Sequence, residues 1–191
     1  LSAITGLRLE NLRTHRGRIT IENFAKNLLP TGRILDIYDG SQAYADPLAD
    51  TTNQVVIPQS LIVLASRITP AAFPYFQDVF EIQDVEDYIT LNDDAYWPVT
   101  DLEIGHATDL AAALSLDEQL TAFVAHGIYD MVTPYFRTDY LLEQSVIGAA
   151  ARDRVNRGLY RGGHMFYLNA EGRRAFFEDI RAFFDYSGER D

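Results

Sequence analysis

The chain has 191 residues, of which 47% are hydrophobic and 12% aromatic, enough apolar surface for a packed core. Its formal net charge of −12 argues against a nucleic-acid partner, because only Arg13, Arg16 and Arg18 form a small basic cluster. No run approaches the roughly 18 apolar residues of a membrane-spanning helix. The absence of cysteine excludes disulfides, thiolate metal sites and a cysteine nucleophile.

The N-terminal stretch predicts a helix followed by a loop. Apolar residues recur at helical spacing from Ile21 to Leu29, and Pro30 with Gly32 ends that helix. The following residues, 32–50, are rich in Gly, Asp and Pro, which predicts an irregular loop.

Two further helices are expected before residue 84. The first is a short helix over 58–67, and Thr69-Pro70 is typical of an N-cap followed by the first residue of a second helix. The stretch 84–100 is acidic and aromatic. Its carboxylates lack the regular spacing of a calcium loop, so we interpret them as a solvated acidic face and predict no metal site.

From residue 106 the pattern alternates between helices and strands. Thr108 indicates the start of a helix, the apolar run 119–126 a buried strand, and Thr133-Pro134 the start of the next helix. A weaker strand is expected over 155–160. Asn169 is expected to cap a final helix with one apolar stripe, formed by Phe176, Phe177, Ile180, Phe183 and Phe184.

This order of elements is typical of the end of a doubly wound α/β sheet. We therefore predict that 106–191 form the C-terminal part of such a core, and that 1–105 form a mostly helical cap or insertion.

Each predicted strand is followed by one polar residue, Asp130 after the first and His164 after the second. Ligands gather beyond the carboxyl ends of parallel strands, and the order Asp then His fits the last two members of an α/β-hydrolase triad. We therefore expect the two side chains to lie within hydrogen-bond reach of each other. Gly162-Gly163 would allow close backbone packing of the loop that carries the imidazole. The alternative is that Asp130 is a turn residue and His164 a packed loop residue.

The other histidines are weaker candidates. His126 lies inside the apolar strand run and is expected to be a hydrogen-bonded core residue, whereas His15 lies in a basic, exposed helix. His106 has no supporting pattern. The triad also needs a nucleophile upstream of Asp130, but none of the seven serines lies in a G-x-S-x-G elbow.

The segments GIYDMVTPYFRTDY (127–140) and YRGGHMFY (160–167) resemble the C-terminal part of serine carboxypeptidases, most closely the bacterial branch. The stretches LSAITGLRLENLRTHRGRITIENFAKNLL and ITPAAFPYFQDVF also resemble parts of that family, so the similarity covers most of the chain. One departure is that the 32–40 loop keeps Asp36 but lacks the arginine expected shortly after it.

The resemblance implies an α/β-hydrolase fold with a helical cap, and release of C-terminal amino acids from peptides through an acyl-enzyme. It implies that Asp130 and His164 are the triad Asp and His, and that Met165 lines the pocket for the departing residue. Alternatively, Met165 fills the core. No cofactor is implied.

The expected partners are a peptide substrate and the N-terminal portion of the same protein, which would carry the nucleophilic serine. The chain begins at Leu1 without a methionine or a signal peptide, so we expect a piece of a longer product. A periplasmic or secreted location is expected, with any signal upstream. This chain alone should be inactive. The alternatives are a non-catalytic binding or assembly module, and an esterase or acyltransferase on the same scaffold.

Overall fold

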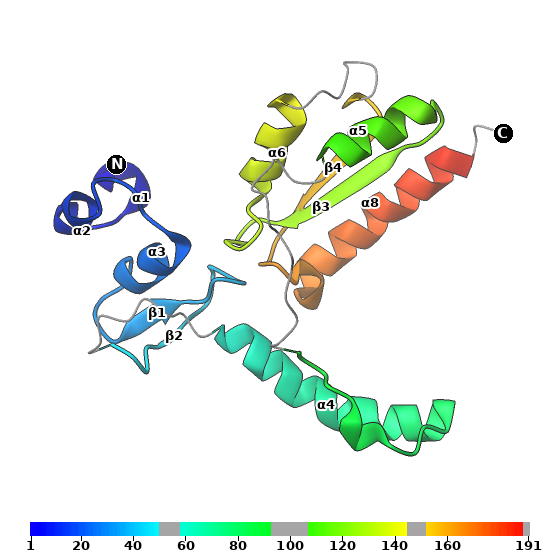
Figure 1. The fold of residues 1–191 in the computed structure, drawn as a ribbon, viewed down its shortest axis with the longest axis horizontal. Helices are drawn as coiled ribbons and strands as arrows, with labels where there is room; N and C mark the ends of the chain where they lie inside the picture. The colour runs from blue at the N-terminus through cyan, green and yellow to red at the C-terminus, as the bar shows by residue number, and fades with distance from the viewer. Residues whose placement is uncertain (50–57, 93–106, 145–151, 189–191) are drawn as a thin grey trace. The chain divides into compact units, whose positions relative to one another are not determined.

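The structure, a computed structural model, describes residues 1–49, 58–92, 107–144 and 152–188 (Figure 1). Helices and small sheets are mixed along the chain, which fits the predicted α/β class. The chain divides into two compact units, Leu1–Val56 with Leu102–Asp191, and Ile57–Asp101. No helix in the described ranges is long and apolar enough to cross a membrane.

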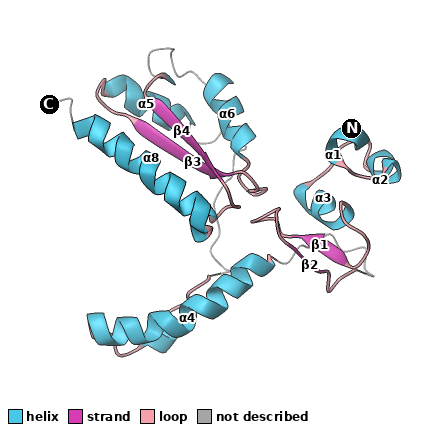
Figure 2. Cartoon of the chain, turned by 180° about the vertical axis from the view of Figure 1, so that it is seen from behind, coloured by secondary structure: helices cyan, strands magenta, loops and turns pink. Residues whose placement is uncertain are grey.

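A parallel pair of strands lies at the centre of the C-terminal part. Strand β3 (Ala122–Gly127) pairs with β4 (Val155–Tyr160) in the register Ala122↔Val155 to Gly127↔Tyr160. Helices α5 (Ala107–Leu116), α6 (Tyr135–Gln144) and α8 (Ala170–Gly188) surround the pair, and α6 lies between the two strands in the sequence (Figure 2). Both strands confirm the sequence prediction, although β3 begins later than residue 119.

The two faces of this sheet pack against different helices. Partners in a parallel register point to the same face, so Phe123 and Tyr160 share the face that α8 covers. The Phe123 ring lies 5.5 Å from that of Phe183, and the Tyr160 ring 5.5 Å from that of Phe176. The opposite face belongs to a cluster with α5 and α6, formed by Leu110, Ala111, Leu114, Leu120, Leu142 and Val155.

The ends of α5, β3 and β4 are tied together by Arg154. Its guanidinium donates to the carbonyl oxygens of Leu114 at 2.6 Å, Asp117 at 2.7 Å and Leu120 at 3.0 Å. Carbonyls at the C-terminus of a helix lack intrahelical partners, and a cation there is also favoured by the helix dipole. One side chain therefore fixes the entry into both strands.

Three helices begin the chain: α1 (Ser2–Thr5), α2 (Leu9–Thr14) and α3 (Ile21–Asn27). Thr20 caps α3, because its hydroxyl oxygen accepts a hydrogen bond from the Asn23 N–H at 3.2 Å. The helix predicted from Ile21 onward is therefore confirmed, and it ends at Asn27.

The loop predicted over 32–50 instead contains an antiparallel hairpin. Strands β1 (Arg33–Leu35) and β2 (Ala43–Ala45) pair from Arg33↔Ala45 to Leu35↔Ala43. The prediction was wrong because Ile34 and Leu35 are buried with Ala25, which gives this short strand a core to pack on. Part of that core is Met131, which follows Asp130 in the sequence.

Contacts of this hairpin connect the N-terminal segment with the loops after the C-terminal strands. Residues 1–49 belong with the C-terminal strands, because the loop between β1 and β2 bonds to the loops after β3 and β4. The predicted boundary at residue 105 separates these segments, whereas the compact units keep them together.

The unit Ile57–Asp101 contains α4 (Gln59–Phe80) and the 3-10 turn η1 (Val85–Asp87). The sequence predicts two helices here, but α4 continues through Pro70 and Pro74. The Thr69 hydroxyl donates to the Ala65 carbonyl at 2.9 Å, a bond of a helix interior rather than of an N-cap. In η1 and before it, the carboxylates of Asp84, Glu86 and Asp87 are exposed, as predicted.

Candidate active site

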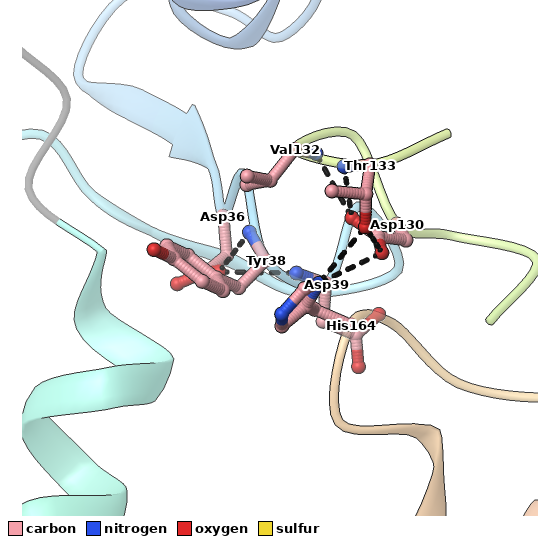
Figure 3. A network of polar contacts seen from close by, with 7 residues as sticks. All are labelled: Asp36, Tyr38, Asp39, Asp130, Val132, Thr133 and His164. Carbon is pink, nitrogen blue, oxygen red and sulfur yellow. Dashed lines mark hydrogen bonds and ion pairs between the residues drawn. The ribbon is translucent and has the colours of Figure 1, made fainter. Parts of the chain in front are cut away.

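Asp130 and His164 lie close together beyond the carboxyl ends of β3 and β4. Pairing between the strands continues into their loops, with the Ile128 N–H donating to Tyr160 O at 2.9 Å and the Tyr129 N–H to Gly162 O at 3.0 Å. His164 Nδ1 lies 2.9 Å from Asp130 Oδ2 (Figure 3). The predicted hydrogen bond between these two residues is therefore confirmed.

Four hydrogen bonds hold the Asp130 carboxylate, whose residue is only 5% exposed. Oδ1 accepts from the N–H groups of Val132 and Thr133, both at 2.9 Å, and Oδ2 accepts from Thr133 Oγ1 at 2.6 Å and from His164. A buried carboxylate is stable only when its oxygens are satisfied in this way. Three of these four hydrogen bonds come from the turn after β3, so the turn holds the carboxylate independently of the imidazole.

The two pKa values move apart because of this contact. Burial by itself raises the pKa of Asp130, but the hydrogen bonds from His164 and Thr133 outweigh it, so the pKa lies below its ordinary value. The hydrogen bond to Asp130 raises the pKa of His164, and burial opposes this only in part. The site therefore favours an ionised Asp130 beside a more basic imidazole.

The geometry also fixes which ring nitrogen carries the proton. With Nδ1–H donating to Asp130, the neutral imidazole keeps Nε2 free to accept a proton. The His164 side chain is 39% exposed while that of Asp130 is 3% exposed, so the imidazole is accessible and the carboxylate is not. This arrangement suits general base catalysis.

Glycines permit the close packing of these loops. Gly162 has a φ of 134°, which side-chain-bearing residues rarely adopt. A Cβ on Gly163 would lie 2.0 Å from the Tyr38 carbonyl oxygen, and one on Gly127 would lie 1.9 Å from the Gly163 oxygen. The close approach predicted for Gly162-Gly163 is confirmed, and it extends to the β1–β2 hairpin.

Two contributors to the site are absent from the sequence prediction. The Thr133 hydroxyl bonds to Asp130 and lies 3.1 Å from His164 Nδ1, whereas the sequence suggests only a helix cap. The other contributor is the loop Asp36–Gly40, whose Tyr38 carbonyl accepts the His164 N–H at 2.6 Å. The short run DIYDG (36–40) is the local signal that could have drawn attention to it, and the structure buries its first acid, Asp36.

The remaining candidates in the described ranges are Met165, His15 and His126. Met165 is half-buried next to His164 in the sequence, and His15 Nε2 accepts from Asn23 Nδ2 at 2.6 Å. His126 is half-buried, and its Nε2 is enclosed without a hydrogen-bond partner in the part of the chain that the structure describes. The prediction of a hydrogen-bonded His126 was therefore wrong. Its side of β3 faces a cavity of about 330 Å³ that includes Tyr135 and Thr138.

His106, Asp93 and Asp94 lie outside the described residues. Four serine hydroxyls donate to nearby acceptors rather than to the imidazole, namely those of Ser2, Ser41, Ser66 and Ser115. Within the described ranges, no group of three or more His, Asp or Glu side chains is arranged to hold a metal ion.

Comparison of the chain with protein-family models, with curated proteins and with solved structures finds no match. A function must therefore be inferred from the geometry of Asp130, Thr133 and His164 and from the order of the strands that carry them.

Proposed function

We propose that this chain is the C-terminal part of a serine carboxypeptidase-like hydrolase with an α/β-hydrolase core. The observation that carries the proposal is the 2.9 Å contact between His164 Nδ1 and Asp130 Oδ2 at the ends of neighbouring parallel strands. The order Asp then His along the chain matches that of α/β-hydrolases. The resemblance of 127–140 and 160–167 to serine carboxypeptidases supports the peptide substrate.

In the proposed reaction a serine on an upstream segment attacks the last peptide bond of the substrate. His164 Nε2 takes the serine proton and returns it to the leaving amino group, and Asp130 stabilises the imidazolium that forms between these steps. Water then hydrolyses the acyl-enzyme with His164 again acting as the base. Met165 would line the pocket of the departing residue, where its flexible thioether suits varied side chains.

The partner that supplies the serine would also complete the sheet. Within the described residues β3 and β4 form a sheet of two strands, which is marginal by itself. Phe177 and Phe184 on α8 are 63% and 66% exposed, so part of its apolar surface is uncovered. An N-terminal portion of the same protein that adds strands would bury such surface. A hydrolase of this kind would act in the periplasm or outside the cell.

The completeness of the pair favours an enzyme over a non-catalytic module. A module that only binds has no need to hold a buried carboxylate with four hydrogen bonds and to direct one of them at an accessible imidazole. Burying an ionised group costs free energy unless every partner is in place. An esterase or acyltransferase on the same scaffold would use the same pair, so the test includes both substrate classes.

The test compares the 191-residue chain with the full product of its gene. A blocked dipeptide and an activated ester serve as substrates, and a fluorophosphonate probe labels an activated serine. We expect turnover and labelling only for the full product, and loss of turnover by about 10⁶ in kcat for His164→Gln. Turnover by the 191-residue chain that requires His164 but resists serine-directed inhibitors would contradict the proposal and indicate other chemistry.

A further inference from the structure

The loop Asp36–Gly40 between β1 and β2 contacts the loops of both proposed catalytic residues. Its Gly40 N–H donates to Tyr129 O at 2.8 Å, and its Ile37 carbonyl accepts the Met131 N–H at 3.2 Å, so it contacts the residues on either side of Asp130. Its third backbone contact is with His164, whose N–H donates to Tyr38 O at 2.6 Å. One loop thus connects the two loops that carry the Asp–His pair.

The loop is held in shape by Asp36, which is only 1% exposed. Its Oδ1 accepts from the N–H groups of Tyr38 at 2.8 Å and Asp39 at 3.1 Å (Figure 3). The Asp39 N–H and the Tyr38 carbonyl belong to one peptide unit. In a trans peptide these two groups point in opposite directions. By holding the N–H, Asp36 therefore directs the Tyr38 carbonyl toward His164.

Side chains add a second contact at the same place. The Tyr38 ring meets the His164 ring edge-on, with the centroids 5.3 Å apart and an interplanar angle of 88°. Edge-to-face contacts of this kind favour one relative orientation of the rings. Asp130 and Thr133 therefore hold the imidazole of His164 at Nδ1, and the Tyr38 ring packs beside it. The Tyr38 carbonyl holds the backbone N–H of the same histidine.

We propose that the loop Asp36–Gly40 is a positioning element that holds His164 on Asp130, with Asp36 and Tyr38 as its positioning residues. The effect of this loop on turnover rests on the proposed function, but its effect on the orientation of the imidazole does not. Without the loop, His164 would be held by its Nδ1 contacts alone at the end of a glycine-rich turn. Rotation away from Asp130 would then compete with the pairing.

Gly163 offers a substitution that disturbs the docking without changing charge. A Cβ there would lie 2.0 Å from Tyr38 O and 2.5 Å from Asp39 Cα, so Gly163→Ala forces the loop away. Gly163 is not among the residues with positive φ, so alanine suits its own backbone. Ser41→Ala is the matched control, because that hydroxyl donates only to Asp39 at the outer side of the hairpin.

A second pair of variants separates shape from charge. Asp36→Ala and Asp36→Asn both remove the negative charge, but only Asn keeps an oxygen that can accept from Tyr38 and Asp39. A positioning role predicts a strong effect for Ala and a small one for Asn. An electrostatic role predicts equal effects for both.

The experiment is NMR of the 191-residue chain, in which His164 is identified with His164→Gln and its ring protons are titrated. We expect Gly163→Ala and Asp36→Ala to lose the low-field Nδ1–H resonance and to lower the pKa of His164, while Ser41→Ala and Asp36→Asn keep both. Amide exchange in β1 and β2 shows whether the hairpin stays folded, and a Tyr38–His164 ring contact reports docking.

The proposal is overturned if the ring contact is lost while the Nδ1–H resonance and the pKa of His164 stay unchanged, or if the native chain lacks the contact. Where Gly163→Ala fails to fold, the comparison of Asp36→Ala with Asp36→Asn decides between the two roles. The NMR experiment uses no substrate, so it tests the positioning role independently of turnover. If the variants change the Nδ1–H resonance as expected but the full product shows no serine-dependent turnover, only the proposed function is refuted.

Discussion

The Thr133 hydroxyl donates to Asp130 Oδ2 at 2.6 Å and lies 3.1 Å from His164 Nδ1. It therefore occupies the corner between the two members of the pair. The hydroxyl has one proton, which goes to the carboxylate, so toward the imidazole its oxygen acts as an acceptor. The Nδ1–H is shared between Asp130 and Thr133, which limits rotation of the ring about the Asp130 contact.

Replacing Thr133 by valine should weaken the pair while preserving its shape. The loss of a hydrogen bond to a charged group predicts a fall of about 1.5 kcal/mol in the free energy of unfolding, the low end of the usual range because Thr133 is exposed. Urea unfolding of the 191-residue chain measures this. Thr133→Ser keeps the hydroxyl and should stay close to the native value. A loss for Thr133→Ser without a loss for valine would show that the methyl group matters and the hydroxyl does not.

The His164–Asp130 contact should make stability depend on pH. The folded pKa of His164 lies above its unfolded value of 6.5, so its stabilisation is complete below that value and is lost as pH rises through the folded pKa. The difference in unfolding free energy between the native chain and His164→Gln should thus be larger at about pH 6 than at about pH 9. A difference that grows toward high pH would contradict the assigned direction.

Asp130 should contribute in the opposite pH range. Its folded pKa lies below the ordinary 3.8, so the stabilisation is present above that value and disappears as pH falls through the folded pKa. Asp130→Asn should therefore cost more stability at about pH 6 than at about pH 3. Acid titration of unfolding, with Asp139→Asn as a control at the more exposed ion pair of Arg157, measures this contrast.

In the full gene product the same pair should set the pH profile of turnover. A general base works when neutral, so kcat should rise with pH around a pKa above 6.5. Asp130→Asn removes the interaction that raises this pKa, which should move the rising limb to lower pH and reduce kcat by about 10⁴. A rising limb that stays in place in Asp130→Asn would show that another group titrates.

The sequence predicts the central strands and the Asp–His pair because their signals are local. An apolar run that ends at Gly127 and a single polar residue in the following turn are sufficient to place Asp130, and Gly162-Gly163 places His164. The final helix is capped as predicted, with Asn169 Oδ1 accepting from Glu171 and Gly172 at 3.0 Å. Such features depend on neighbours in the chain.

The contributions missed by sequence reasoning depend on residues far apart in the chain. Tyr38 contacts His164 from a distant part of the sequence, and β1 forms because Ile34 has a core to enter. Neither partner can be read from a local pattern. Thr133 followed by Pro134 predicts a helix cap, whereas in the structure the nearby carboxylate takes the Thr133 hydroxyl.

The apolar stripe of α8 is divided in two by its surroundings. Phe176 is half-buried against Phe123 and Tyr160, with ring centroids 6.3 Å and 5.5 Å away, whereas Phe177 is 63% exposed. In the 191-residue chain, Phe176→Ala should lower the free energy of unfolding by about 3 kcal/mol, and Phe177→Ala should change it by less than about 0.5 kcal/mol.

The full gene product turns this contrast into a test of the proposed partner. If an N-terminal portion covers the outer side of α8, burying the Phe177 ring should make Phe177→Ala cost about 2 kcal/mol there, since apolar burial of a large side chain is worth that much. Thermal or urea unfolding of both forms gives the comparison, with Phe176→Ala as the control that is costly in each. A Phe177→Ala effect that stays near zero in the full product would mean that this side of α8 remains exposed to solvent. The proposed additional strands would then have to join the sheet without covering this helix.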